Sequence, residues 1–230
     1  MTRTRTTLSV FALLAWGLCA PPAGAEIWPG AARRLERDLA SSEVSVRQAA
    51  VVKLADLPRA TARRLLLRAL DDADSLVSSS ALELLLRLET PRVTERVVPW
   101  LSGSDKRLRL SAALALGVAP APNATPALAR ALADSDAEVR AAAATALGAS
   151  QSAEAVLPLL GHLDDSVPEV REAVVGALGQ LGDARAVLPL IGKIEDPRPA
   201  VRAGTARALG FLRDPRSASA LLLALRDSDR

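Results

Sequence analysis

Apolar positions recur along this chain in a fixed order. Hydrophobic residues stand at i, i+4, i+7 and i+8, for example Val139, Ala143, Ala146 and Leu147, and polar or small residues separate them. This spacing places the apolar side chains on one face of a helix. The pattern returns every 31 residues in six copies that begin at Val46, Val77, Leu108, Val139, Val170 and Val201. A fixed period of this size predicts a stack of structural repeats.

Each copy follows an acidic turn, and each turn follows another apolar helical segment. These preceding segments span residues 31–40, 60–70, 93–101, 125–132, 153–163, 184–194 and 217–226. Asp and Ser in the turns are suited to cap the next helix, and Gly148, Gly179 and Gly210 are expected to end it in the left-handed conformation. Pro158 and Pro189 predict a late helix start or a kink. The expected fold is all-α, a right-handed α-solenoid of six helix pairs plus one final helix.

The first 25 residues do not share this pattern. Arg3 and Arg5 precede an apolar run over residues 8–20, and Ala23 and Ala25 bracket Gly24 at the end of the segment. The run is shorter than the roughly 20 residues that span a bilayer. The pattern is typical of a cleaved export signal over residues 1–25, followed by a repeat domain over residues 26–230 in the periplasm or outside the cell.

Composition limits the chemistry of the chain after cleavage. Removal of residues 1–25 lowers the 29 basic residues to 27 against 26 acidic residues, which leaves a net charge of +1. It also removes the single cysteine, so the mature chain has no disulfide and no thiolate metal site. Hydrophobic residues make up 50% of the sequence and aromatic residues only 2%. A near-neutral chain without stacking side chains is not expected to bind nucleic acid, and no membrane contact is expected after cleavage.

The repeated Asp-x5-Arg pattern resembles the HEAT-repeat superfamily, in the short form named after phycobilisome lyase subunits. Three pairs carry the resemblance: Asp134 and Arg140, Asp165 and Arg171, and Asp196 and Arg202. In such proteins these residues form a ladder of hydrogen bonds between adjacent repeats, and the resemblance implies this role for the three pairs. Each of the first three repeats lacks one member, in Ser41/Arg47, Asp72/Ser78 and Gly103/Arg109. A continuous ladder is therefore expected only in the carboxy-terminal half.

Catalytic constellations are scarce. His162 is the only histidine, so a metal site with several histidines cannot form. A Ser-His-Asp triad would have to use this one residue. The acidic residues of the turns could hold a cation, but their place before each helix already explains them as caps. We therefore expect no catalytic residue, no metal and no cofactor.

The remaining candidate is a surface. Positions i+2 and i+6 of the repeated helix lie opposite the core positions and are expected to line a concave groove. The residues of interest are Glu83, Leu110, Leu114, Ala141, Thr145, Glu172 and Arg207. Leu110 and Leu114 are expected to form an exposed apolar contact centre for a helix or peptide of another protein.

These features predict an exported, non-catalytic scaffold that binds another protein. The alternative is a lyase-like or maturation subunit that acts only with a second chain. The apolar last helix additionally suggests end-to-end self-association.

Overall fold

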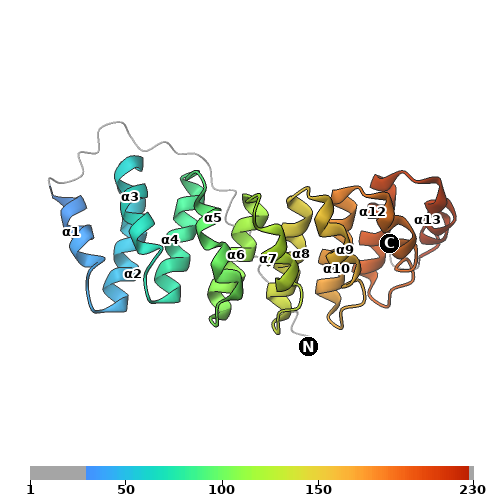
Figure 1. Ribbon diagram of the computed structural model, residues 1–230, viewed down its shortest axis with the longest axis horizontal. Helices are drawn as coiled ribbons and strands as arrows, with labels where there is room; N and C mark the ends of the chain where they lie inside the picture. The colour runs from blue at the N-terminus through green and yellow to red at the C-terminus, as the bar shows by residue number, and fades with distance from the viewer. Residues whose placement is uncertain (1–29, 228–230) are drawn as a thin grey trace, which may run out of the picture.

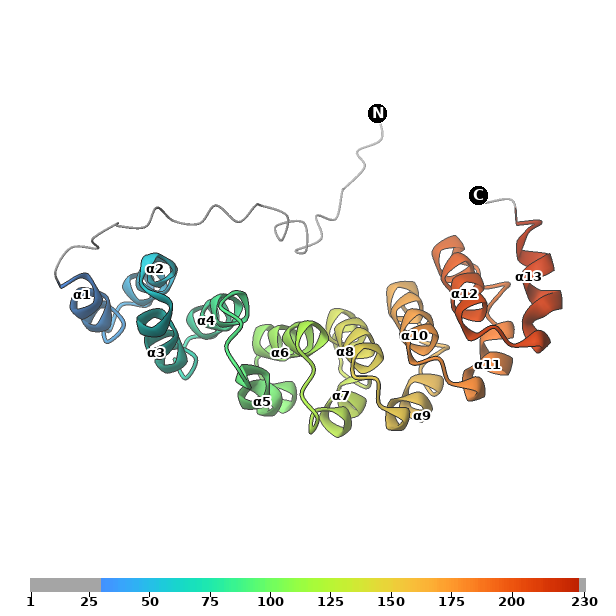
Figure 2. The same ribbon diagram turned by 90° about the horizontal axis from the view of Figure 1, so that it is seen from above.

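The computed structural model describes residues 30–227, and these residues form a row of helix pairs (Figure 1) that curves into an arc (Figure 2). We call the first helix of each pair A and the second B. Figure 2 shows the B helices along the inner, concave side of the arc and the A helices from α3 to α11 along the outer side. Within residues 30–227 there are no strands. The predicted α-solenoid of six pairs plus a final helix is confirmed, whereas the export signal lies outside the described residues.

The B helices are the longer elements. They are α2 (Val44–Lys53), α4 (Ser75–Arg87), α6 (Lys106–Val118), α8 (Ala137–Ala149), α10 (Pro168–Leu181) and α12 (Pro199–Leu212). The A helices are α1 (Ala31–Asp38), α3 (Arg59–Ala69), α5 (Val93–Val97), α7 (Thr125–Ala131), α9 (Val156–Leu160), α11 (Val187–Ile191) and α13 (Ala218–Ala224). Short 3-10 helices accompany them at Leu54–Asp56, Val98–Ser102, Ala153–Ala155, Ala184–Ala186 and Pro215–Ser217.

The late start expected from Pro158 and Pro189 is confirmed. A 3-10 turn comes first, and α9 and α11 then begin at Val156 and Val187, two residues before each proline. Both prolines therefore lie in the first α-helical turn, where a backbone N–H has no partner within the helix.

The predicted core columns are buried. The i+4 column is at most 2% exposed, and the i+8 leucines are at most 1% exposed. Val77, Val139, Val170 and Val201 of the first column are also fully buried. Val46 is instead 38% exposed, because it belongs to the first repeat, which no earlier B helix covers. Small side chains in the i+4 column let the helices approach to about the 8–10 Å that packed helices adopt.

The expected role of the repeated glycines is wrong. Gly148, Gly179 and Gly210 lie inside α8, α10 and α12 with helical dihedral angles, and each helix continues beyond its glycine. The left-handed residue comes three positions later, at Gln151, Gly182 and Arg213, with φ of 53°, 67° and 50°.

Close helix packing explains these glycines instead. A Cβ atom on Gly148 would lie 2.8 Å from Ala177 Cα, and one on Gly179 would lie 3.0 Å from Ala208 Cα. Neighbouring B helices therefore touch through backbone at these two points, where a side chain has no room.

Aspartate caps begin the middle B helices, as expected. Asp74 accepts hydrogen bonds from the backbone N–H groups of Leu76 and Val77, and Asp105 and Asp136 cap α6 and α8 in the same way. Leu222 of the last helix, α13, is 64% exposed, and Leu225, which follows the helix, is 76% exposed. End-to-end association through this helix stays a prediction.

Candidate binding surface

The B helices lie along the concave side (Figure 2), and most of the predicted groove residues on these helices are accessible. Glu83, Thr145, Glu172 and Arg207 are exposed, and Ala141 is half-buried. These four exposed residues come from α4, α8, α10 and α12. The inner face is therefore built by successive repeats, each of which contributes a different side chain.

The expected apolar centre of the groove is less exposed than predicted. Leu110 and Leu114 of α6 are half-buried and pack against the continuous hydrophobic core. The corresponding residues of the flanking B helices are the small or polar Ser79 and Ala141. The two leucines therefore contribute part of their surface to the core and expose only the remainder.

A hollow lies elsewhere on the inner face, across α8, α10 and α12. Its volume is about 500 Å³. Its walls contain three of the predicted groove residues, Thr145, Glu172 and Arg207. The other lining residues are Glu169, Ala173, Gly176, Ala177, Gly179, Gln180, Gly204, Ala208 and Phe211. A volume of this size falls within the roughly 300–1,000 Å³ of ligand sites in proteins.

Two lining residues, Gln180 and Phe211, follow the glycines that were expected to end the helices. They occupy equivalent positions 31 residues apart. Because α10 and α12 extend to Leu181 and Leu212, both residues still lie on a helix and face the same hollow. In the sequence, each of these two residues directly follows a Leu-Gly pair, and they could have been found from this position if the helices had been expected to continue past the glycine.

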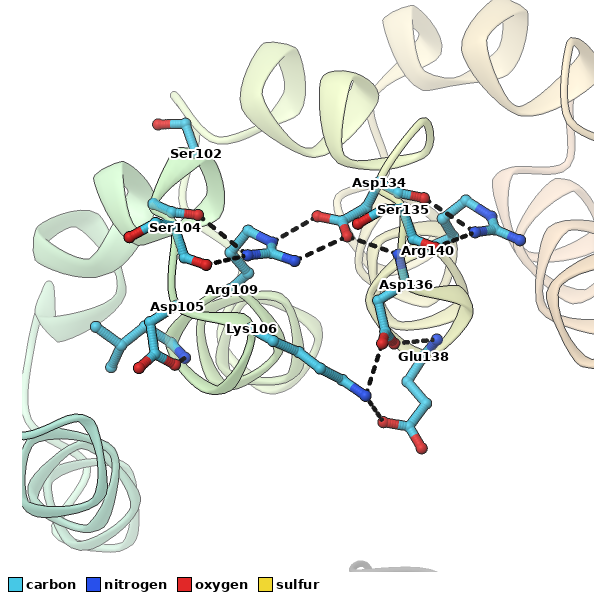
Figure 3. A network of polar contacts seen from close by, with 12 residues as sticks. Ser102, Ser104, Asp105, Lys106, Arg109, Asp134, Ser135, Asp136, Glu138 and Arg140 are labelled. Carbon is cyan, nitrogen blue, oxygen red and sulfur yellow. Dashed lines mark hydrogen bonds and ion pairs between the residues drawn. The ribbon is translucent and has the colours of Figure 1, made fainter.

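Arginine and aspartate side chains link successive repeats in a ladder, with the arginine in a B helix and the aspartate in the next repeat's turn. Arg140 donates from Nε to Asp165 Oδ2 at 2.8 Å and from Nη2 to Asp165 Oδ1 at 2.9 Å. Its third nitrogen, Nη1, donates to the carbonyl oxygen of Asp134 at 2.9 Å. Figure 3 shows the preceding rung, in which Arg109 lies between the Ser104 carbonyl and the Asp134 carboxylate.

The ladder contains five rungs in the described residues. They are Arg47–Asp72, Arg109–Asp134, Arg140–Asp165, Arg171–Asp196 and Arg202–Asp227. Each arginine thus pairs with the aspartate 25 residues later, whereas the Asp-x5-Arg pairs of one repeat meet only through a backbone carbonyl. All six predicted ladder residues take part, but with these different partners.

The ladder is continuous only toward the carboxy terminus, as expected, because four rungs follow one another from Arg109 to Asp227. Arg47 and Asp72 form one further rung, and the interruption within residues 30–227 falls at positions 78 and 103, which hold Ser and Gly. Ser78 is buried and its hydroxyl donates to carbonyls of its own turn. Ladder partners stand 25 residues apart in the sequence, not six. The missing arginine at position 78 and the missing aspartate at position 103 therefore belong to the same rung.

Restoring the missing rung should stabilise the solenoid. The double substitution Ser78→Arg with Gly103→Asp is expected to raise the free energy of unfolding by about 1–2 kcal/mol, as a well-formed charged hydrogen-bonded pair does. Gly103 already has φ −71° and ψ 162°, which aspartate adopts readily, although its new Cβ would lie 3.2 Å from the Trp100 carbonyl oxygen.

Urea unfolding of the double variant and both single variants measures this effect. Ser78→Arg alone should be neutral or destabilising, because its guanidinium then lacks a carboxylate. Additive single effects with no favourable coupling would contradict the pairing scheme.

The ladder makes the fold sensitive to acid. The hydrogen bond from Arg140 lowers the pKa of Asp165, and that from Arg171 lowers the pKa of Asp196. Burial by itself would raise the pKa of Asp134, but the hydrogen bonds from Arg109 and from the Asp136 N–H outweigh it. The folded pKa values thus lie below the value of about 3.9 for an unfolded chain. Their contribution is complete above that pH and is lost as the pH falls through the folded values.

We therefore expect the free energy of unfolding to decline below about pH 4. Urea titrations at pH 7, 5, 4 and 3 measure this decline. Asp183 and Asp214, whose pKa values are lowered to about 2 by Arg185 and Arg216, add to it. Asp165→Asn removes one ladder carboxylate and should reduce the slope. An unchanged slope would show that the ladder is not its source.

The polar residues of the turns have structural partners. His162 Nδ1 lies 2.9 Å from the Pro158 carbonyl oxygen at the end of α9, as a helix-end role requires. Lys106 bridges Asp136 and Glu138 of the next repeat at 2.7 and 3.0 Å (Figure 3). Among residues 30–227 no cluster of three potential metal ligands occurs. Over the same range no helix is long and apolar enough to cross a bilayer.

Comparison with known proteins identifies the type of repeat. The sequence model of the family described as HEAT repeats matches residues 94–174 and 156–230. No curated protein matches the chain.

Several solved structures are similar. The X-ray structure of YibA from E. coli has a TM-score of 0.67 at 20% identity, over 87% of this chain and 77% of that one. A designed armadillo repeat protein has a TM-score of 0.58 at 20% identity, over 78% and 98%. The complex of CpcE and CpcF of phycocyanin lyase from Nostoc sp. PCC7120 has a TM-score of 0.47 at 26% identity, over 93% and 77%. The first two likenesses show a shared fold.

Proposed function

This chain belongs to the family of HEAT-repeat proteins, and from that premise we propose that it is an exported, non-catalytic scaffold that binds another protein in its concave groove. The observation that carries the proposal is the contrast between its two sets of columns. The core column of Leu147 is leucine in every repeat, and that of Ala143 contains only alanine, valine or threonine. The inner column, by contrast, reads Val52, Glu83, Leu114, Thr145, Gly176 and Arg207. A shared core with a variable concave surface is how solenoids present extended binding faces.

The polar groups support a role without catalysis. Asp74, Asp105 and Asp136 cap helices, and the ladder aspartates are held by arginines. These carboxylates already act in the fold, and none of them projects into the hollow of the inner face. The pattern of residues 1–25 supports export to the periplasm or the outside of the cell.

Site-specific crosslinking tests the groove. A photoreactive amino acid at Thr145, on the inner face, should capture a protein in the source cells, whereas one at Leu157, which is 65% exposed on the outer helix α9, should not. Capture only from position 157 would contradict the proposal.

Cell fractionation with and without residues 1–25 tests export. The full chain should leave the cytoplasm and lose this segment, and the shortened chain should remain inside. Equal distributions of the two chains would contradict an export signal.

A further inference from the structure

The hollow on the inner face exists because one helix position lacks a side chain. Gly176 of α10 stands between Thr145 of α8 and Arg207 of α12 in the same inner column. It is exposed, and a Cβ atom built on it would meet nothing within 4 Å. Ala173, Ala177, Gly204 and Ala208 complete a floor of small residues. The hollow is therefore open space with a backbone and methyl floor.

An aromatic side chain borders this space. Phe211 is 73% exposed, and it is the only phenylalanine within residues 30–227. Phenylalanine buries roughly 150–250 Å² in protein contacts, so its exposure next to a hollow leaves a large apolar area for a partner to cover. Such an aromatic beside a pocket is typical of the centre of an interface.

Unpaired charges of opposite sign flank the floor. Glu172 of α10 and Arg207 of α12 line the hollow, and neither forms an ion pair with another residue in the described range. Glu169 adds to the acidic side and lies 3.7 Å from Arg198. Neighbouring packed helices stand about 8–10 Å apart, and an extended chain advances about 3.3 Å per residue. Arg207 is equivalent to Gly176, four residues beyond Glu172, so the two charges are also offset by about 6 Å along the helix axis. Their separation of about 10–12 Å matches charges four residues apart on an extended segment, in which side chains i, i+2 and i+4 share one face.

Resting on the proposed scaffold function, we propose that this hollow binds an extended segment of a partner protein with a basic residue at Glu172, an acidic residue at Arg207 and a large apolar side chain between them. The apolar side chain enters the space above Gly176 and contacts Phe211. The charges set the direction of the segment, because the opposite direction would place like charges together. The hollow thus recognises a basic–apolar–acidic sequence.

A library of random 12-residue peptides, selected against residues 26–230, tests this assignment. The enriched peptides should contain a basic and an acidic residue about four positions apart with a large apolar residue midway between them, because side chains i, i+2 and i+4 of an extended chain share one face. Gly176→Leu fills the hollow and should weaken their binding about tenfold or more. The matched control is Gly210→Leu, since Gly210 is also an exposed helical glycine with nothing within 4 Å of an added Cβ. It should leave binding within about twofold.

Reversal of the charge at Arg207 tests the pairing of charges, which the Gly176→Leu variant does not test. Arg207→Glu should weaken the selected peptides about tenfold, and replacement of their acidic residue by lysine should restore binding to this variant. Thermal unfolding of each variant confirms that the fold is retained.

If the selected peptides bind Gly176→Leu as tightly as the parent protein, the assignment of the hollow is overturned. If crosslinking from Thr145 still captures a partner in that case, the proposed scaffold function stands. A library without binders overturns the assignment as well, and absence of crosslinking from Thr145 would then remove both proposals. Dimers that form at high concentration and disappear in Gly176→Leu would identify a second copy as the occupant and overturn the assignment to another protein.

Discussion

Replacement of Arg140 by alanine should lower the free energy of unfolding by about 2–4 kcal/mol, because removal of one partner leaves a largely buried charge without its counter-ion. Only 14% of the Arg140 side chain and 8% of the Asp165 side chain are exposed. After the substitution, the Asp165 carboxylate keeps only the backbone N–H of Val167, and the Asp134 carbonyl loses the Nη1 donor. A single change thus weakens one interface between repeats and one contact within the repeat that contains Arg140.

Arg96→Ala is the matched control. Arg96 also pairs with an aspartate 25 residues away, since its Nη2 donates to both carboxylate oxygens of Asp71 at 2.8 and 3.0 Å. These side chains are 44% and 68% exposed, so water replaces the lost contacts, and the loss should stay below about 1 kcal/mol. Urea unfolding followed by circular dichroism compares the two variants. Equal shifts would show that burial of the ladder adds nothing to stability.

Gly148→Ala should destabilise the protein by about 1–3 kcal/mol, although alanine is the better helix former. The new methyl group would lie 2.8 Å from Ala177 Cα and 2.9 Å from Ala177 Cβ of the neighbouring helix. A backbone atom cannot rotate away as a long side chain can, so α8 and α10 must separate. Gly179→Ala should behave alike, because its added Cβ would lie 2.8 Å from Ala208 Cβ.

The same column contains its own controls. An added Cβ on Gly210 meets nothing within 4 Å, and one on Gly117 meets Ala146 Cα at an ordinary 3.8 Å. Gly210→Ala and Gly117→Ala should therefore stabilise the protein by up to about 1 kcal/mol through helix propensity alone. Thermal and urea unfolding of the four variants measure the sign of each effect. A stabilising Gly148→Ala would show that the helices are not in backbone contact there.

The sequence by itself determined the repeat, its length and its core. The 31-residue period and the columns through Ala143 and Leu147 required only local rules, because a buried helix face repeats its apolar residues every turn. The aspartate caps and the late start of α9 and α11 were likewise readable from single repeats. The resemblance to HEAT repeats implied that Arg140 and Asp165 belong to a ladder.

Only the tertiary structure decided how the repeats meet. Arg140 pairs with the Asp165 carboxylate of the next repeat and not with the Asp134 carboxylate of its own repeat. Gly148 allows close contact between its helix and Ala177, and Leu110 is partly buried against the core. The hollow beside Phe211 also depends on three helices from three repeats. Each of these features depends on the distance and rotation between helices separated along the chain. A periodic pattern specifies which residues face inward, whereas the packing of unlike side chains specifies which of them touch.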